Sequence, residues 1–239
     1  MVSLASSQVL AICKDAAGIA GNIFAFGLFL SPMPTFMRIM RNQSTEQFSG
    51  LPYIYGLLNC LICAWYGTPL VSPDNLLVTS VNSVGAVFQL AYIVLYVTYT
   101  EKEKKFRMFG WILTVFGLFV IIVLGSLFIL DLELRRIIIG SLSCASLISM
   151  FASPLLIIVC LTNLVIRTRS VEFMPFCLSL STFLMSASFL LYGIFSSDPF
   201  IYVPNGIGTL LGVTQLLLFA HYRNSSREDS AEGLIVSYS

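Results

Sequence analysis

The chain has 239 residues, of which 57% are hydrophobic and only 10% are charged, and its mean hydropathy is +0.88. Soluble domains carry about 25% charged residues, so this chain has too few charges to cover a surface that faces water. The net charge of +1 leaves no basic surplus to neutralise phosphates, which excludes a nucleic-acid partner. The composition therefore predicts an all-α polytopic membrane protein whose exterior faces lipid.

Seven runs of mostly apolar residues are long enough to cross the hydrocarbon as helices, which takes about 20 residues each. Short turns with Pro, Asp and Ser separate the second run from the third and the sixth from the seventh, so both pairs are predicted to form tight helical hairpins. The polar tail at 223–239 is predicted to be disordered. In chain order, the predicted spans are 16–38, 51–70, 76–99, 109–130, 137–162, 174–195 and 200–222.

The distribution of lysine and arginine predicts how these spans are oriented. One side of the membrane receives ten of these residues, and the other receives only Lys14, Arg135 and Arg136. Cytoplasmic loops carry the excess of positive charge, so the C-terminus is predicted to be cytoplasmic. With an odd number of spans, the N-terminus is then extracytoplasmic.

The sequence repeats itself on either side of the fourth span. Each unit contains three spans, and the single helix between them restores the orientation, so the two repeats are parallel. The predicted organisation is 3+1+3, with the first repeat at 1–100, a linker helix at 101–135 and the second repeat at 136–222. The motifs that recur in the same order are LSP at 30–32 and ASP at 152–154, LPY at 51–53 and MPF at 174–176, WYG at 65–67 and LYG at 191–193, and NSVG at 82–85 and NGIG at 205–208.

Four prolines of the repeat fall in the cytoplasmic half of the predicted spans: Pro32, Pro52, Pro154 and Pro175. Proline removes a backbone hydrogen bond and leaves a kink or hinge in a helix. Four hinges at one depth favour an inner gate that opens by bending helices. The alternative is that these prolines only shape helices, because proline is common in membrane spans.

Asn82 and Asn205 lie at equivalent positions inside two apolar spans. An unpaired amide in hydrocarbon costs on the order of several kcal/mol, so each amide needs a partner. One interpretation is that they bond neighbouring helices together. The interpretation we favour is that they flank a cavity where the repeats meet and bond the hydroxyls of a sugar.

The distribution of titratable residues bears on how transport is driven. No Lys, Arg, Asp or Glu lies deep inside a predicted span, and Asp74 and Asp198 belong to extracytoplasmic turns. Proton-coupled carriers usually need a buried titratable group, so facilitated diffusion of a neutral solute is favoured. Cys60 and Cys63 lack a second cysteine pair or a nearby histidine, so they are expected to line a helix. Neither a metal nor a cofactor is predicted.

Several motifs resemble those of plant SWEET sugar transporters. STEQFSGLPY at 44–53, LNC at 58–60 and WYG at 65–67 are similar to the first repeat of that family. ASP at 152–154, SVEFMPF at 170–176 and PNG at 204–206 are similar to its second repeat. The similarity covers roughly residues 14–222. It implies a bidirectional sugar uniporter that works by alternating access and that forms a homo-oligomer, with trimers known in the family.

The resemblance also implies roles for individual residues. The four prolines match the family's inner gate, and the two asparagines match its sugar-contacting amides. Its outer gate falls on Tyr66, Tyr192 and Asp198, and its two side-wall pocket positions fall on Cys63 and Phe189. A small thiol and a phenyl ring leave a narrow slot with one aromatic face, which favours a monosaccharide over a disaccharide.

A finer resemblance concerns the substrate and the membrane. The run SLSTFLMSAS at 179–188 is similar to a branch of the family associated with glucose and the vacuolar membrane, the plasma membrane being the other expected location. The stretch from Pro154 to Pro175 is longer than the family's usual spacing, with extra residues around 158–162. Either the fifth span extends into the cytoplasm, or Pro154 shifts against Pro175 and disturbs the gate.

Three other functions compete with sugar uniport. A proton-coupled small-solute or amino-acid carrier of related repeat design is the nearest rival. A seven-helix receptor shares the topology, but it does not predict a three-helix repeat. An enzyme is not expected, because no cluster of nucleophile, base and orienting group is visible. The expected partners are therefore a small neutral sugar and the lipid bilayer.

Overall fold

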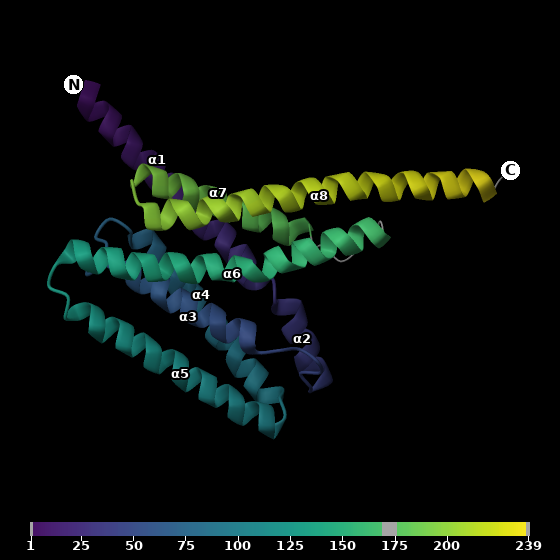
Figure 1. Ribbon diagram of the computed structural model, residues 1–239, viewed down its shortest axis with the longest axis horizontal. Coiled ribbons are helices and arrows are strands. Elements are labelled where there is room, and N and C mark those ends of the chain that lie inside the picture. The colour runs from purple at the N-terminus through teal and green to yellow at the C-terminus, as the bar shows by residue number, and fades with distance from the viewer. Residues whose placement is uncertain (1, 169–175, 238–239) are drawn as a thin grey trace.

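The computed structural model describes the backbone of residues 2–168 and 176–237 and the side chains of residues 7–150, 178–217 and 219–220. These parts of the chain form helices joined by short turns, and they contain no strand (Figure 1). The all-α prediction is thereby confirmed. In chain order the helices are α1 (Val2–Leu30), α2 (Met33–Asn42), α3 (Leu51–Tyr66), α4 (Leu76–Tyr99), α5 (Lys102–Leu127), α6 (Leu132–Thr168), α7 (Phe176–Phe195) and α8 (Pro199–Ser237).

Helix length and hydropathy suit a membrane protein. α1 and α2 together form the first pass, so the helices make seven passes. α3 is an apolar helix of 16 residues, and α6 extends over 37 residues. The segments of the described chain that are long and apolar enough to cross a bilayer are Ser7–Asn42, Leu76–Tyr99, Lys102–Leu127, Leu178–Phe195 and Pro199–Leu217.

The helices pack in the same pattern in both halves of the molecule. In the first half, α4 contacts both α1 and α3, and in the second half, α8 contacts both α6 and α7. Between the halves, α1 contacts α7 and α3 contacts α6. Exchanging α1 with α6, α3 with α7 and α4 with α8 therefore reproduces the same contacts. α5 packs against α3 and runs along the outside of the bundle (Figure 1), which is the predicted 3+1+3 organisation.

The bundle has two distinct ends. The turns at 67–75, 128–131 and 196–198 lie at one end, which we call the turn end (left in Figure 1). Arg135 joins two of these turns, since its guanidinium donates to the carbonyls of Leu70 at 2.8 Å and Ile129 at 2.6 Å. The connections at 31–32, 43–50 and 100–101 lie at the opposite end, which we call the loop end.

The first predicted span is interrupted at the loop end. α1 ends at Leu30, and Pro32 precedes the first residue of α2. A helix end leaves its last carbonyls without helical partners. Tyr92 of α4 satisfies one of them, because its hydroxyl donates to the carbonyl of Phe29 at 2.7 Å. α2 is then held against α4 by its buried side chain Phe36, whose ring stacks on Tyr92 with centroids 4.6 Å apart.

Two other helices extend beyond the predicted spans. The polarity of 223–239 predicts disorder, but α8 continues as a helix to Ser237. This tail contains no proline and several good helix formers, so a helix that is already nucleated can propagate through it. α6 continues to Thr168, so the extra residues around 158–162 lengthen a helix.

Two glycines allow close contact between helices at the turn end. Gly67 follows Tyr66 in α3, and Gly193 follows Tyr192 in α7. A Cβ on Gly67 would lie 2.7 Å from the backbone nitrogen of Thr79, and a Cβ on Gly193 would lie 2.6 Å from that of Tyr202. Only glycine fits such a close backbone approach. A glycine at the C-terminal end of the first helix therefore allows close packing of α3 on α4 and of α7 on α8.

Candidate functional site

A cavity of about 260 Å³ lies between the two halves. Its described lining comes from the six repeat helices, α1, α3, α4, α6, α7 and α8. None of the lining residues in the described part of the chain is charged. A mostly apolar wall with a few polar groups is typical of a binding site for a small neutral molecule.

Asn82 of α4 and Asn205 of α8 both line this cavity. The Nδ2 group of Asn82 donates to the carbonyl of Val78 at 2.9 Å, and that of Asn205 donates to the carbonyl of Ile201 at 2.8 Å. Each bond uses one N–H of the amide and leaves the second N–H and the oxygen for another partner. The two repeats thus bring matching amides to one shared space, and their role as sugar ligands stays a prediction.

Cys63 and Phe189 line the same cavity, and each is 6% exposed. The thiol of Cys63 donates to Oδ1 of Asn59 at 3.7 Å. The ring of Phe189 fills the space beside Gly21, where a Cβ would lie 2.7 Å from the ring, and it packs edge-on against Tyr192 with centroids 6.2 Å apart. Phe189 is therefore a fixed aromatic wall of the cavity.

Three polar residues that were not predicted also line the cavity: Asn59, Gln89 and Ser143. Oδ1 of Asn59 accepts a hydrogen bond from Ser146 of α6 at 2.9 Å, which joins the two halves. Ser143 is one of several serines in its segment, whereas Asn59 and Gln89 each stand as a single amide in an apolar run. That signal could have identified them, but only the asparagine pair is reinforced by the repeat.

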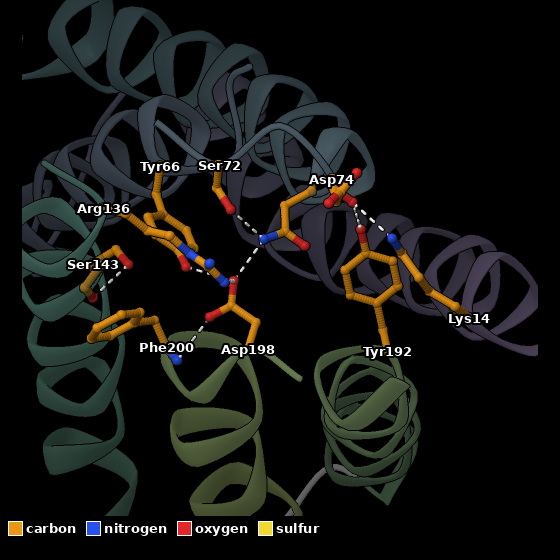
Figure 2. Close-up of polar contacts among 11 residues, drawn as sticks. Lys14, Tyr66, Ser72, Asp74, Arg136, Ser143, Tyr192, Asp198 and Phe200 are labelled. Atoms are coloured by element: carbon orange, nitrogen blue, oxygen red, sulfur yellow. Dashed lines mark hydrogen bonds and ion pairs between the residues drawn. The ribbon is translucent and has the colours of Figure 1, made fainter. Parts of the chain in front are cut away.

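A buried polar cluster lies at the turn end (Figure 2), and one of its members, Tyr66, also lines the cavity. The centre of the cluster is Asp198, which is fully buried. Oδ2 of Asp198 accepts hydrogen bonds from Tyr66 at 2.6 Å and Asn75 at 2.7 Å, and it lies 3.2 Å from the guanidinium of Arg136. Oδ1 accepts from the backbone N–H of Phe200 at 3.0 Å. Because these groups come from α3, α6, α8 and two turns, the cluster ties the two halves together.

A second contact mirrors this cluster from the other repeat. The hydroxyl of Tyr192 and the ammonium of Lys14 both donate to the backbone carbonyl of Asp74 at 3.0 Å. Lys14 also lies over the ring of Tyr192, 5.6 Å from its centroid. Both tyrosines therefore reach across to the opposite half. In the described structure Tyr66 does so through a carboxylate, whereas Tyr192 does so through a backbone carbonyl.

Arg136 and Asn75 are functional candidates that sequence reasoning missed. The sequence placed Asp198 in an extracytoplasmic turn without a partner, and the structure buries it in that turn and pairs it with Arg136, 62 positions earlier in the chain. The only available signal was a pair of opposite charges near the ends of two spans. Helix packing decides which of the charges at that end meet.

The four predicted gate prolines differ in their local structure. Pro32 lies at the break between α1 and α2, as a hinge would. Pro52 lies in the first turn of α3, where proline costs no helical hydrogen bond, so it begins a helix and does not kink one. Pro154 lies within α6, with its side chain outside those described, and Pro175 lies outside the described residues. Pro204 is an interior proline of α8 that the gate prediction did not include.

The loop at 43–50 is fixed by polar contacts at the loop end. Glu46 accepts hydrogen bonds from Asn42 at 2.7 Å and from Arg38 at 2.6 Å, and these two contacts hold the pKa of Glu46 below its usual value. The hydroxyl of Tyr96 donates to the carbonyl of Phe48 at 3.0 Å. The first repeat therefore has an ordered connection between its α1–α2 break and α3.

The two halves of the fold also match one family separately. The family model described as "Sugar efflux transporter for intercellular exchange" matches residues 15–104 and again residues 137–227. These segments coincide with the two three-helix halves. A solved structure of a eukaryotic SWEET transporter superposes with a TM-score of 0.86 at 53% identity, over 90% of this chain and 99% of that chain.

Curated relatives agree with this similarity along almost the full length of the chain. The chain is 66% identical over 230 residues to the bidirectional sugar transporter SWEET2 of Arabidopsis thaliana, covering 96% of each protein. It is 55% identical over 235 residues to the bidirectional sugar transporter SWEET2a of Sorghum bicolor, covering 98% of this chain and 95% of the relative. The family model matches both halves, and the matched segments include all six helices that line the cavity. The chain therefore belongs to the SWEET family of sugar transporters.

Proposed function

We propose that this chain carries a small neutral sugar across a membrane in both directions, as a facilitative uniporter that works by alternating access. The observation that carries the proposal is that Asn82 and Asn205, from the two repeats, present amide groups to one cavity with no charged residue in its described lining. Amides of this kind bond sugar hydroxyls without requiring a charge on the solute. The relatives that match over the whole chain are themselves named bidirectional sugar transporters.

The proposed substrate is a monosaccharide, glucose in particular. Pockets for drug-sized molecules span roughly 300–1,000 Å³. The cavity of about 260 Å³ falls below that range, which favours one sugar ring over two. The fixed ring of Phe189 offers an aromatic face to the C–H face of a pyranose, beside the small thiol of Cys63.

The transport cycle follows from which end of the cavity is closed. The contacts of Asp198 with Tyr66 and Arg136 support a closed turn end, and we propose that sugar enters and leaves at the loop end in this conformation. In the opposite conformation Tyr66 and Arg136 must leave Asp198, and the loop end must close. We assign that closure to the inner-gate prolines Pro32, Pro52, Pro154 and Pro175. No chemical step is part of this cycle.

We also propose an orientation, a location and an assembly state. The turn end carries Lys14, Arg135 and Arg136, and the remaining ten lysines and arginines belong to the other side. The positive-inside rule then places the turn end and the N-terminus outside the cytoplasm and the C-terminus inside it. The vacuolar membrane is the proposed location, with the plasma membrane as the alternative. Protomers are proposed to form a homo-oligomer, a trimer, with one path in each protomer.

Proton-coupled transport is the second candidate, because Asp198 is a buried carboxylate between the halves. Buried carboxylates in membrane proteins often relay protons. Asp198 does not line the cavity, however, and it is surrounded by four donors. These contacts support a structural latch at the turn end more than a relay.

Purified protein in liposomes tests both candidates. We expect labelled glucose to equilibrate in either direction, with a rate that is unchanged by a pH gradient or a protonophore. Unlabelled glucose inside the vesicles should accelerate entry of the label by counterflow. Uptake that requires an inward proton gradient would establish the coupled carrier. If no hexose or disaccharide enters the proteoliposomes faster than it enters protein-free liposomes, the transport proposal is wrong.

A further inference from the structure

Gln89 is a polar residue of the cavity that the transport proposal has not used. It lies seven residues after Asn82 on α4, which is nearly two full turns. The two side chains therefore leave the same face of the helix about 10 Å apart along its axis, and both line the cavity. Gln89 is the one nearer the loop end.

The amide oxygen of Gln89 has no hydrogen-bond partner. Oε1 is buried, and no group in the described part of the chain donates to it. A buried acceptor without a donor costs free energy, so such groups in native proteins usually have an unobserved partner. Because Gln89 lines the cavity, a solute bound there can supply that donor.

Gly56 of α3 makes the space in which this amide lies. A Cβ on Gly56 would lie 3.0 Å from both Cδ and Nε2 of Gln89 and 3.2 Å from Oε1. Alanine would therefore crowd the amide, whereas glycine leaves it room. The amide thus has a fitted position on α3 but no bond there.

The amide occurs on one side of the cavity only. In the pairing that relates Asn82 to Asn205, Gln89 corresponds to Gly212 of α8. A Cβ on Gly212 would lie 2.9 Å from the backbone Cα of Phe183, so no side chain fits there. A solute in the cavity therefore meets an acceptor from the first repeat, with no counterpart from the second.

We propose that Gln89 accepts a hydrogen bond from one hydroxyl of the transported sugar and so helps to select which sugar is bound and in which orientation. This inference rests on the proposed sugar transport. Asn82 and Asn205, related by the repeat, hold the sugar from two sides, and the one-sided oxygen of Gln89 distinguishes the end of the ring that faces the loop end. It is a specificity residue of the path and not a residue of either gate.

Competition by deoxy sugars in proteoliposomes tests this role. The competitors are 2-, 3-, 4- and 6-deoxyglucose, each of which lacks one hydroxyl. For the parent protein, the analogue that lacks the hydroxyl bound by Gln89 should compete with labelled glucose less well, and the lost contact should account for a factor of about three to ten. That factor corresponds to one neutral hydrogen bond. In Gln89→Met, which keeps the length of the side chain, KM for glucose should rise by the same factor. For that single analogue, the part of the penalty that comes from Gln89 should then disappear, and the penalties for the other analogues should remain.

Two variants control for unspecific damage. Gln89→Glu keeps an acceptor oxygen at the same place and should keep the penalty for that analogue. Gln215→Met removes a half-buried amide from α8 that does not line the cavity, and it should leave KM and all penalties unchanged. If Gln89→Met does not yield folded protein, Gly56→Ala replaces it, since the added methyl displaces the amide, and the same analogue should lose its penalty.

The outcomes separate this inference from the transport proposal. If the parent protein carries glucose and Gln89→Met or its replacement keeps the parental KM and every deoxy-sugar penalty, Gln89 does not bind sugar. If the parent protein carries no sugar at all, the proposed function fails instead.

Discussion

Asp198 is the centre of the buried polar contacts at the turn end. Its carboxylate is fully buried and receives hydrogen bonds from Tyr66, Asn75, Arg136 and the backbone of Phe200. Removing one partner of a buried ion pair leaves the other charge uncompensated. Loss of the Arg136 guanidinium should therefore lower the free energy of unfolding by more than the ion pair itself contributes to it.

We predict that Arg136→Gln lowers the free energy of unfolding by about 2 kcal/mol, which is less than for a fully buried pair because the Arg136 side chain is 30% exposed. The double variant Arg136→Gln with Asp198→Asn should lose less than the sum of the single losses, since the contact couples them. Unfolding in detergent, followed for all four proteins, gives the coupling energy. Strictly additive losses would show that the 3.2 Å contact does not join the two groups.

Sequence reasoning succeeded at single positions where the repeat reinforced a chemical signal. Asn82 and Asn205 each interrupt an apolar run, and their equivalence made both conspicuous; the structure places them at one cavity. Arg136 and Asn75 carry no such reinforcement. Their contact with Asp198 depends on how α6 and two turns meet, which no spacing in the sequence specifies.

At the scale of helices, close packing at the turn end depends on two glycines. Gly67 allows α3 to approach α4, and Gly193 allows α7 to approach α8. At both positions the nearest atoms include backbone atoms of the neighbouring helix, which cannot move aside as a flexible side chain would. These two helix contacts position Tyr66 and Tyr192 so that each hydroxyl donates a hydrogen bond to the opposite half.

We predict that Gly67→Ala and Gly193→Ala each lower the free energy of unfolding by about 1–3 kcal/mol, because each methyl overpacks a backbone contact under 3 Å. Thermal unfolding in detergent measures the effect. Gly117→Ala is the matched control: no atom lies within 4 Å of its Cβ position on α5, and alanine is the better helix former, so stability should stay equal or rise. Equal losses in all three variants would mean that the close approach is not the cause.

The bounds of the helices were less predictable than the number of membrane passes. An apolar run at 16–38 reads as one span, yet Pro32 divides it, and Phe36 then turns α2 toward Tyr92 of α4. The stacking that holds α2 there is a tertiary contact, invisible to hydropathy. Similarly, α8 extends through a polar tail because an existing helix can propagate through a sequence with fewer apolar residues than a separate segment would need to form a helix.

At the scale of the whole molecule, two halves of one fold are joined with unequal contacts. The repeat motifs and the odd linker predicted the 3+1+3 arrangement, and the exchange of α1 with α6, α3 with α7 and α4 with α8 shows it. The same symmetry did not predict that one half supplies a buried carboxylate latch at Asp198 and the other a backbone contact at Asp74. These differences arise from single residues, so they change the contacts at the turn end without altering the fold.

The central claim is that the two halves hold one sugar between them through Asn82 and Asn205. Glucose flux into proteoliposomes, measured for Asn82→Ala and Asn205→Ala, tests it most directly. Asn22→Ala is the control, because Asn22 donates to the carbonyls of Gly18 and Leu77 and does not line the cavity. We predict that each cavity variant folds and loses at least about tenfold in flux, through lost hydrogen bonds to hydroxyls, while Asn22→Ala keeps most of its flux. Folded Asn82→Ala and Asn205→Ala proteins that carry glucose at the parental rate would contradict the account.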